Sequence, residues 1–564
     1  MEFVDLIPIP TLDGVTLSGA CYNSPVDGTL CMTGHHLILS SRKQGIEELW
    51  LLHMAIDTVE RKPNSVERKP NKESPGGVIV IKCKDFRIIM LGIDNTEHFN
   101  CVAQSLEDIV KMEVLNYKYA FYYRPLYKIL EDGWKMFSPE TELARLCSLD
   151  EPSEWRITHC NENYDVCPSY SRLLIVPSSI TDDIIKESAK YRDSGRFPVL
   201  CYQYKAKNSI LVRSSQPLPG PNAKRSKADE KLLNGYLKSG KKGTIIDTRT
   251  QTLAQSAKNK GGGTELEQFY PQWKRVHKPV DKHTVLLDSL AKFIEASNDV
   301  TCSMDKWLSR LDASVWMSNI KEILSCAYSV VQCLDQEGTT VLVHGSEGLD
   351  STLVITSLVQ VMLNSECRTI RGLQALIERE WLQAGYPFQL RHRYSCYSPQ
   401  RTKAQSPTFL LFLDCLYQLQ NQFVCSFEFS SEFLILMFEH SYFSPYGTFL
   451  LNSEQERVKA NLSESTSSLW SYVNRPELLA TLRNPLYQVN TRVICPSTSP
   501  VSLDLWRELY LRWVSDQSTQ KSVWNTIAQL IDNDKQLICK AISLRTQLKE
   551  LESQLQLNGG LCKT

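Results

Sequence analysis

The stretch VLVHGSEGLDST, from Val341 to Thr352, decides the fold prediction. An apolar, β-branched run ends at His344, a glycine-containing turn follows, and the next residues, STLVITSLVQVML, predict a helix. A strand, a tight loop and a helix start often bind phosphate, because the backbone N–H groups and the helix dipole attract an anion. Between His344 and Thr352 there is no cysteine, lysine or arginine, so the loop has the form of an anion site without a reactive side chain.

Length and composition indicate a soluble protein of several domains. The 564 residues suggest about three units, because a domain usually has roughly 100–200 residues. The 63 basic residues equal the 63 acidic ones, so the net charge identifies no partner, and we expect no nucleic-acid binding. The first residues, MEFVDLIPIPTLDG, do not resemble a signal peptide, and no apolar run is long enough to span a membrane. We therefore expect an intracellular protein.

The 18 cysteines are scattered, and many lie inside apolar runs such as LLFLDCLYQL. No C-x-x-C pair occurs, so the sequence favours reduced, mostly buried thiols over disulfides or a zinc site. His159, Cys160 and Cys167 come nearest to a metal-binding cluster. We expect these three residues to be structural, and we predict no metal and no cofactor.

Short β-branched and aromatic runs, broken by Gly, Asn and Asp, occupy residues 12 to 97 and predict a small antiparallel β domain. The helical spacing of TEHFNCVAQSLEDIVKMEVL, which starts at Thr96, predicts a helix that caps the sheet. We place the end of this domain at residue 122. A repeat, VERKPNS followed by VERKPNK (residues 59 to 72), is polar and contains proline, so we interpret it as a mobile hairpin insertion.

From residue 123 to 512, strand-like runs such as FPVLCYQY alternate with helical periods such as VLLDSLAKFIEAS, which predicts an α/β domain with a largely buried sheet. Within it, PNAKRSKADEKLLNGYLKSGKK (Pro221 to Lys242) carries seven basic residues against two acids. We interpret this stretch as a solvated helical face. The alternative is a rim that attracts phosphorylated lipid head groups. That rim would consist of Lys224, Arg225, Lys227, Lys241 and Lys242.

The C-terminal segment follows a heptad pattern, which predicts a coiled coil over residues 515–557. Its leucines recur every seven residues at the d positions, and leucine there favours a coiled coil over an amphipathic surface helix. The residues of this seam recur in alternating steps of four and three; they are Val523, Ile527, Leu530, Asp534, Leu537, Ala541, Leu544, Leu548, Leu551 and Leu555.

One a position of this seam, Asp534, carries a charge. In a parallel pair of identical helices the two copies of Asp534 would face each other, which costs desolvation and repulsion. A lysine, arginine or asparagine in a different partner would relieve that cost. We therefore predict that Asp534 disfavours a homodimer, with a homo-oligomer as the alternative.

Three chemistries use a strand, a loop and a helix, and each needs particular side chains. A Walker loop requires Gly-Lys-Ser/Thr at the helix start, where Asp350 and Ser351 stand instead. A serine hydrolase places its nucleophile between small residues, but His344 crowds the turn before Ser346. Cysteine phosphatases require His-Cys, five residues and Arg, which supply a thiolate and a guanidinium that holds the phosphate. In that frame this sequence has His344, Gly345 and Ser351.

The loop resembles that of the myotubularin phosphoinositide 3-phosphatases, whose active members carry His-Cys-Ser-Asp-Gly-Trp-Asp-Arg-Thr in the same frame. The likeness continues through RTIRGLQALIEREWLQAGYPFQLR (Arg368 to Arg391) and, upstream, through SGRFPVLCYQYKAKNSILVRSSQPLPG and KNKGGGTELE. It implies a PH-GRAM domain over residues 1–122, an α/β domain of the cysteine phosphatase fold over residues 123–512 and a C-terminal coiled-coil helix.

The departures from the active members fall on the reactive positions. Gly345 replaces the nucleophilic cysteine and Ser351 the phosphate-binding arginine, and Leu349 replaces a tryptophan. Without a thiolate and a guanidinium the covalent route is lost, so we expect no catalysis and little anion binding. We expect the retained Asp350 to cap the following helix. The degenerate loop comprises His344, Gly345, Ser346, Glu347, Gly348, Leu349, Asp350 and Ser351.

The resemblance also implies a function. Inactive myotubularins pair with active members and raise their stability, membrane recruitment or activity toward phosphatidylinositol 3-phosphate and 3,5-bisphosphate. We expect such pairing through the coiled coil, in the cytoplasm and at the surface of endomembranes such as endosomes and the endoplasmic reticulum, with peripheral contact to membrane phosphoinositides. Two alternatives are a phosphoinositide-binding scaffold that works without an active partner and a residual hydrolase that uses Ser346.

Overall fold

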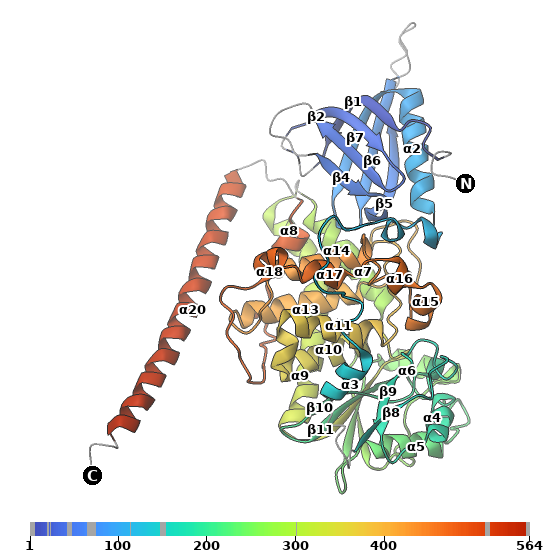
Figure 1. Ribbon diagram of the computed structural model, residues 1–564, viewed down its shortest axis with the longest axis vertical. Helices are drawn as coiled ribbons and strands as arrows, with labels where there is room; N and C mark the ends of the chain where they lie inside the picture. Colours follow the sequence, from blue (N-terminus) through green and yellow to red (C-terminus); the bar gives the residue numbers. More distant parts are fainter. Residues whose placement is uncertain are drawn as a thin grey trace.

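The computed structural model describes residues 6–19, 22, 24–41, 48–64, 75–112, 114–146, 154–299, 302–513 and 519–559. It comprises a β domain, a larger α/β body and one long C-terminal helix (Figure 1). No helix in these ranges is long and apolar enough to cross a membrane. The cysteines in the same ranges form no disulfide.

The β domain is one antiparallel sheet of seven strands with the order β4-β3-β2-β1-β7-β6-β5. The strands are β1 (Thr11–Ser18), β2 (Val26–Met32), β3 (His36–Ser41), β4 (Leu49–Leu52), β5 (Ile56–Pro63), β6 (Pro75–Cys83) and β7 (Ile88–Asn95). Alternate residues face the core, as the buried Ile89, Leu91 and Ile93 of β7 show. Helix α2 (Thr96–Lys111) packs against β5 and β6, which confirms the predicted capping helix.

The polar repeat lies at the β5–β6 hairpin. Val59 of its first copy pairs with Ile81, and Pro63 pairs with Gly77. The second copy, from residue 66 to 72, lies outside the described residues.

The body is built on a five-stranded sheet with the order β10-β11-β14-β12-β13. Its strands are β10 (Val199–Tyr204), β11 (Ser209–Ser214), β12 (Gly243–Asp247), β13 (Trp273–His277) and β14 (Thr340–His344). Only the edge strand β10 is antiparallel to its neighbour within this described sheet. Central β14 is buried on both faces, because Val341 and Val343 pack into one core and Leu342 into another. The predicted α/β domain with a buried sheet is confirmed.

Helices cover both faces of this sheet. The larger core contains α7 (His283–Ser297), α9 (Trp316–Asp335), α10 (Ser351–Leu363), α13 (Thr408–Gln422) and α14 (Ser431–Tyr442). The smaller core contains α4 (Asp182–Ala189), α5 (Lys227–Gly235) and the ribbon of β8 (Trp155–Thr158) and β9 (Leu174–Pro177). The shorter helices are α3 (Pro139–Leu146), α6 (Gln251–Asn259), α8 (Met304–Ala313), α11 (Ile370–Ile377), α12 (Phe388–Arg391), α15 (Glu454–Lys459), α16 (Leu462–Ser465), α17 (Leu469–Val473), α18 (Pro476–Leu482) and α19 (Arg507–Tyr510).

The β domain rests on the helical layer of the body (Figure 1). Asp57 of β5 accepts hydrogen bonds from the backbone N–H and the hydroxyl of Ser395, at 2.7 and 2.8 Å. Phe86, in the β6–β7 turn, stacks on Phe438 of α14 and belongs to the core of the body. Buried polar and aromatic contacts therefore join the two domains.

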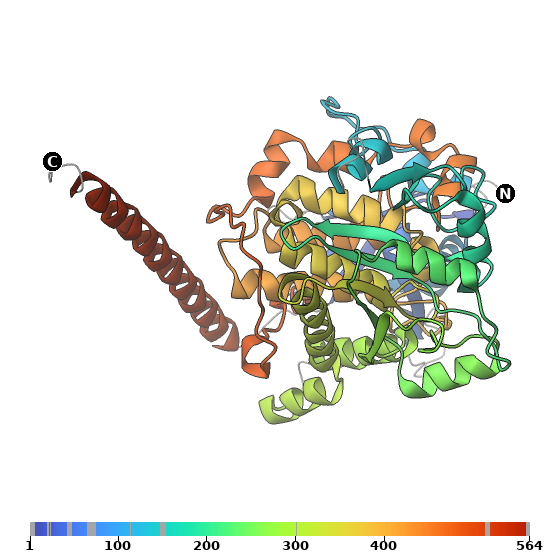
Figure 2. The same cartoon turned by 90° about the horizontal axis from the view of Figure 1, so that it is seen from below.

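Helix α20 (Thr519–Gly559) runs beside the body, and its C-terminal half stands clear of the body in both views (Figures 1 and 2). One face of α20 contacts the body, where the Sγ of the buried Cys539 lies 3.4 Å from the Sγ of Cys425. On the same face Lys535 Nζ lies 3.4 Å from Asn421 Oδ1. The described leucines of α20 are exposed.

Candidate functional site

The degenerate loop lies at the carboxyl edge of the central strand, between β14 and α10. The residues that follow the neighbouring strands hold it: Gln216 N–H donates to Ser346 O, and Thr248 N–H donates to His344 O, both at 3.0 Å. Gly348 has φ of 68°, and a Cβ at this position would lie 2.5 Å from Ser214 O. Only glycine fits there, so the sharp turn of an anion-binding loop is kept.

Hydroxyl groups surround the position where the active members carry their nucleophile. A Cβ on Gly345 would lie 3.1 Å from Thr248 Oγ1, 3.3 Å from Thr352 Oγ1 and 3.4 Å from Ser351 Oγ. Thr248 Oγ1 and Ser351 Oγ are themselves hydrogen-bonded at 2.9 Å. Hydroxyls attack phosphate only when a base activates them, and this cluster contains no base.

His344 belongs to a buried charge network beneath the loop. Its Nε2 lies 3.2 Å from Glu265 Oε2, and its Nδ1 lies 3.3 Å from Gly345 O. Arg192 donates to Glu265 at 2.7 Å and binds Asp229 through two hydrogen bonds of 2.6 and 2.8 Å. Burial alone would raise the pKa of Glu265, but His344 and Arg192 together hold that pKa below its ordinary value. The network positions the loop.

Asp350 occupies the N-cap position of α10, but its carboxylate caps nothing. Its Oδ2 accepts a 2.7 Å hydrogen bond from Arg391 Nη2, and its Oδ1 accepts one from the Thr408 hydroxyl at 3.0 Å. The same guanidinium lies 3.4 Å from Glu347 Oε2. The expectation that Asp350 acts as a helix cap is therefore wrong, because its carboxylate forms an ion pair with Arg391 from a distant segment.

Ser346 is half-buried, and the described part of the chain places no hydrogen-bond partner on its hydroxyl. Both ring nitrogens of His344 are directed to Glu265 and to Gly345 O. A general base must lie within hydrogen-bond reach of the proton it removes. His344 does not meet this requirement for Ser346.

The five basic residues of the predicted rim are exposed and lie at two separate places. Lys224, Arg225 and Lys227 stand at the start of α5, and Arg225 forms two 2.8 Å hydrogen bonds with Glu230. Lys241 and Lys242 precede β12 at the amino edge of the sheet, where Lys241 donates to Gly338 O. The loop lies at the carboxyl edge, a strand length of roughly 15 Å away. The five residues do not form one rim.

His159, Cys160 and Cys167 form no metal site. Across the described ranges, no group of His, Cys, Asp and Glu side chains is close enough to hold a metal ion. Cys167 is buried, and its Sγ lies 3.5 Å from Ser169 Oγ and 3.7 Å from Ser194 O.

The predicted heptad seam lies on α20. Its leucines in the described part are 57–64% exposed; they are Leu530, Leu537, Leu544, Leu548 and Leu551. Asp534 and Ala541 are exposed as well. Val523, Ile527 and Leu555 belong to the helix, but their side chains lie outside the described part of the structure. The leucine seam therefore faces solvent on a single helix, and no contact in the described residues covers it.

Sequence reasoning missed the residues that hold the loop, namely Arg192, Asp229, Glu265, Thr248 and Arg391. The signal was partly present, since Glu265 lies in KNKGGGTELE and Arg391 ends the stretch that begins at Arg368. Charged residues inside otherwise apolar or glycine-rich segments are expensive to bury unless they are paired.

Comparisons with known proteins identify the family. Residues 118–458 match the model of the myotubularin-like phosphatase domain, and residues 13–109 match that of the MTMR6-9 GRAM domain. The chain belongs to the myotubularin family. It is 49% identical to myotubularin-related protein 9 of Bos taurus over 554 residues, which cover 98% of this chain and 99% of that protein. The resemblance inferred from the sequence is confirmed.

Two further myotubularins extend the comparison. Myotubularin-related protein 9 of Homo sapiens is 48% identical over 98% of this chain and 99% of that protein. Phosphatidylinositol-3,5-bisphosphate 3-phosphatase MTMR2 of Mus musculus is 34% identical over 90% of this chain and 78% of that protein. The myotubularin GRAM match falls on the β domain, and the phosphatase match falls on the α/β body.

Proposed function

We propose that this myotubularin is a noncatalytic regulatory subunit. It binds an active myotubularin through α20 and raises the stability, recruitment or activity of that phosphatase toward phosphatidylinositol 3-phosphate and 3,5-bisphosphate. The observation that carries the proposal is the hydroxyl cluster around Gly345, because neither Thr248 nor Ser351 can replace a thiolate nucleophile.

The charges around the loop support the absence of catalysis. In a cysteine phosphatase a guanidinium holds the transferred phosphate and stabilises its charge in the transition state. Two arginines contact this loop: Arg391 pairs with Asp350, and Arg196 donates to Gly348 O at 3.0 Å and to Ala384 O at 2.9 Å. Glu347 adds a negative charge beside that pair. A phosphate group would therefore enter a loop in which both neighbouring guanidinium groups already have partners and in which Glu347 adds a negative charge.

The exposed leucine seam supports the role as a partner. Burying a leucine side chain contributes roughly 1.5–3 kcal/mol, so several leucines on one stripe favour helix pairing strongly. The contact through Cys539 lies on the opposite side of α20 and leaves the seam open. The proposal places this complex in the cytoplasm, at the surface of endomembranes such as endosomes and the endoplasmic reticulum.

Two other functions have less support. A phosphoinositide-binding scaffold without a partner would leave the leucine seam without a role. A hydrolase that uses Ser346 would need a base, and His344 is directed elsewhere.

A phosphate-release assay on the full-length chain, with both phosphoinositides as substrates, tests the absence of catalysis. We expect no turnover above that of Ser346→Ala. We also expect little rescue by Gly345→Cys with Ser351→Arg, because the new Cβ at position 345 would lie 3.1 Å from Thr248 Oγ1. Turnover by the natural sequence that Ser346→Ala abolishes would contradict the proposal.

A further inference from the structure

The turn between β6 and β7 contacts the segment that leads into α20. The turn contains Asp85, Phe86 and Arg87, and the segment runs from Tyr510, the last residue of α19, to Trp513. The indole N–H of Trp513 donates to the backbone oxygen of Asp85 at 2.8 Å. The ring of Phe86 stacks on that of Tyr510, with 6.0 Å between the ring centroids. The β domain therefore holds the chain directly before α20.

Two guanidinium groups lie over the ring of Trp513. That of Arg87 lies 4.4 Å from the ring centroid, and that of Arg512 lies 4.7 Å from it. An aromatic face attracts a cation, and the attraction is stronger where water is excluded. The β domain therefore holds Trp513 through its ring as well as through its indole N–H.

Ion pairs link the same segment to both domains. Asp85 is buried and accepts a 3.0 Å hydrogen bond from Arg87, while Arg512 Nη2 lies 3.8 Å from Asp85 Oδ2. Arg512 Nη1 lies 2.8 Å from Glu439 of α14. Arg512 therefore bridges a carboxylate of the β domain and a carboxylate of the body. Because a buried charge is costly without its partner, separation of the segment from the turn is disfavoured.

The backbone of Phe86 indicates that the turn is shaped for this contact. Its φ is 72°, in the left-handed region that glycine adopts most easily. A larger residue persists in such a conformation only when its surroundings fix it. The Phe86 ring is buried and stacks on Phe438 of α14 as well as on Tyr510. These contacts offset the unfavourable backbone conformation of Phe86.

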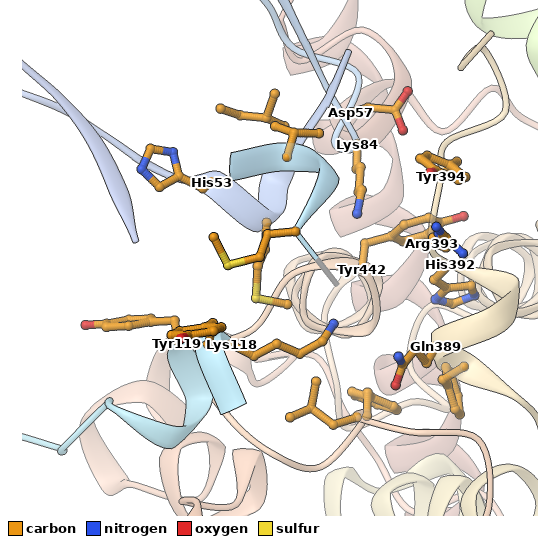
Figure 3. Close-up of a pocket in the computed structure, with 18 of the residues that line it drawn as sticks. His53, Asp57, Lys84, Lys118, Tyr119, Gln389, His392, Arg393, Tyr394 and Tyr442 are labelled. Carbon is orange, nitrogen blue, oxygen red and sulfur yellow. The ribbon is translucent and has the colours of Figure 1, made fainter. Parts of the chain in front are cut away.

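The turn is less tightly packed on its other side. A cavity of about 250 Å³ lies between the β domain and the body, and Figure 3 shows the side chain of Lys84, the residue before Asp85, directed into it. Lys118 and Arg393 line the same cavity. Close-packed protein cores contain few spaces larger than a water molecule. The turn can therefore shift relative to the body more easily than a core residue can.

A short connection joins this contact to α20. Residues 514 to 518 lie between Trp513 and the first residue of α20, Thr519. An extended chain spans at most roughly 3.6 Å per residue, so α20 begins within roughly 22 Å of Trp513. The contacts of α20 with the body through Lys535 and Cys539 lie further along the helix. The start of α20 is therefore tied to the β domain.

We propose that the β6–β7 turn is a clamp through which the β domain sets the position of α20. A displacement of the β domain moves Trp513 and with it the start of α20, and so changes how the leucine seam is presented. Arg87 and Trp513 are positioning residues of this clamp. The proposal concerns the placement of α20 alone, so it holds whether or not α20 pairs with an active phosphatase.

Two measurements on the full-length chain test the clamp. Spin labels at the exposed positions of Asn100 on α2 and Asn533 on α20 report the distance between the β domain and the helix by double electron–electron resonance. The labels are attached to genetically encoded ketone amino acids, so the native cysteines stay unmodified. Limited trypsin digestion reports the clamp itself, because trypsin cleaves after Arg512. Cleavage after the exposed Lys549 of α20 is the internal control.

Two variants open the clamp in different ways. Trp513→Ala removes the ring and the indole donor, and Arg87→Gln removes the cation of the β domain from the ring. Arg87→Gln decides the test if Trp513→Ala does not fold. Trp50→Ala is the matched control, because Trp50 is a 59% exposed residue of β4 whose indole donates to Glu48 of the same domain.

We expect a narrow distance distribution for the natural sequence and for Trp50→Ala, and a broader one for Trp513→Ala and Arg87→Gln. Cleavage after Arg512 should be at least about fivefold faster in both clamp variants, because proteolysis follows the population of the opened segment. Cleavage after Lys549 should not change. A broad distribution for the natural sequence, or clamp variants that match Trp50→Ala in distance distribution and cleavage rate, would overturn the proposal.

Discussion

At the residue scale, Glu265 and Arg192 remain beneath the loop although the loop lacks the reactive cysteine and arginine. The loop has neither cysteine nor arginine in its reactive frame, but the charged side chains beneath it still form ion-pair contacts and are almost completely buried. Removing one partner from such a network leaves an uncompensated buried charge, which typically costs about 3–5 kcal/mol. We infer that these residues now serve the stability of the domain centre.

The variant Glu265→Gln tests this inference. We expect it to lower the free energy of unfolding at pH 7 by about 3–5 kcal/mol in urea denaturation, because Arg192 and His344 lose their shared carboxylate. The control Glu187→Gln removes an exposed ion pair with Lys190 and should change the free energy of unfolding by less than about 0.5 kcal/mol.

The difference in stability between the natural sequence and Glu265→Gln depends on pH, because the pKa of Glu265 is lowered in the folded state from the ordinary 4.5. A lowered pKa stabilises the fold fully above the unfolded value, and the stabilisation disappears as the pH falls through the folded value. The gap between the natural sequence and Glu265→Gln should therefore shrink only in acid below pH 4.5. Equal stability of the two at pH 7 would contradict the inferred role.

At the element scale, α20 has one face that contacts the body and one face that is exposed. The face with Cys539 and Lys535 lies against the body, and the leucine seam lies in solvent. The exposure of Asp534 on that seam leaves it free to meet a residue of a partner helix. Its charge at an a position would penalise an identical helix and tolerate a basic or amide partner.

The variant Asp534→Leu should therefore shift α20 toward self-association, measured as a larger homodimer fraction in sedimentation or native mass spectrometry. Asp532→Leu is the matched control, because Asp532 lies near the body and outside the seam. If Asp534→Leu left the balance of self-association and hetero-association unchanged, the role of Asp534 would be excluded.

Elements followed from the sequence more reliably than side-chain partners. The run that ends at His344 and the helix that starts at Thr96 were predicted, because strand and helix periods are local. The predicted role of Asp350 is wrong, because its partner Arg391 is 41 residues away and no local sequence pattern indicates that ion pair. The basic stretch was likewise divided by α5 between opposite edges of the sheet.

At the scale of the whole molecule, buried contacts join the β domain to the body, and a cavity lies between them. Lys84, Lys118 and Arg393 lie far apart in the sequence, so only the assembled fold brings them together. The family and its two matched domains could be inferred from the loop and its flanking motifs. The cavity could not be inferred in this way, because its lining residues come from segments far apart in the sequence and no local pattern shows that they meet.

The central claim is that this chain acts through an active relative. The most direct measurement is affinity purification of the full-length chain from cells with mass spectrometry, repeated with a chain that ends at residue 514 and with Leu537→Glu plus Leu544→Glu. We predict that a myotubularin with an intact Cys-x5-Arg loop is recovered with the full-length chain and lost with both variants. Recovery of no such phosphatase, or equal recovery by all three chains, would contradict the claim.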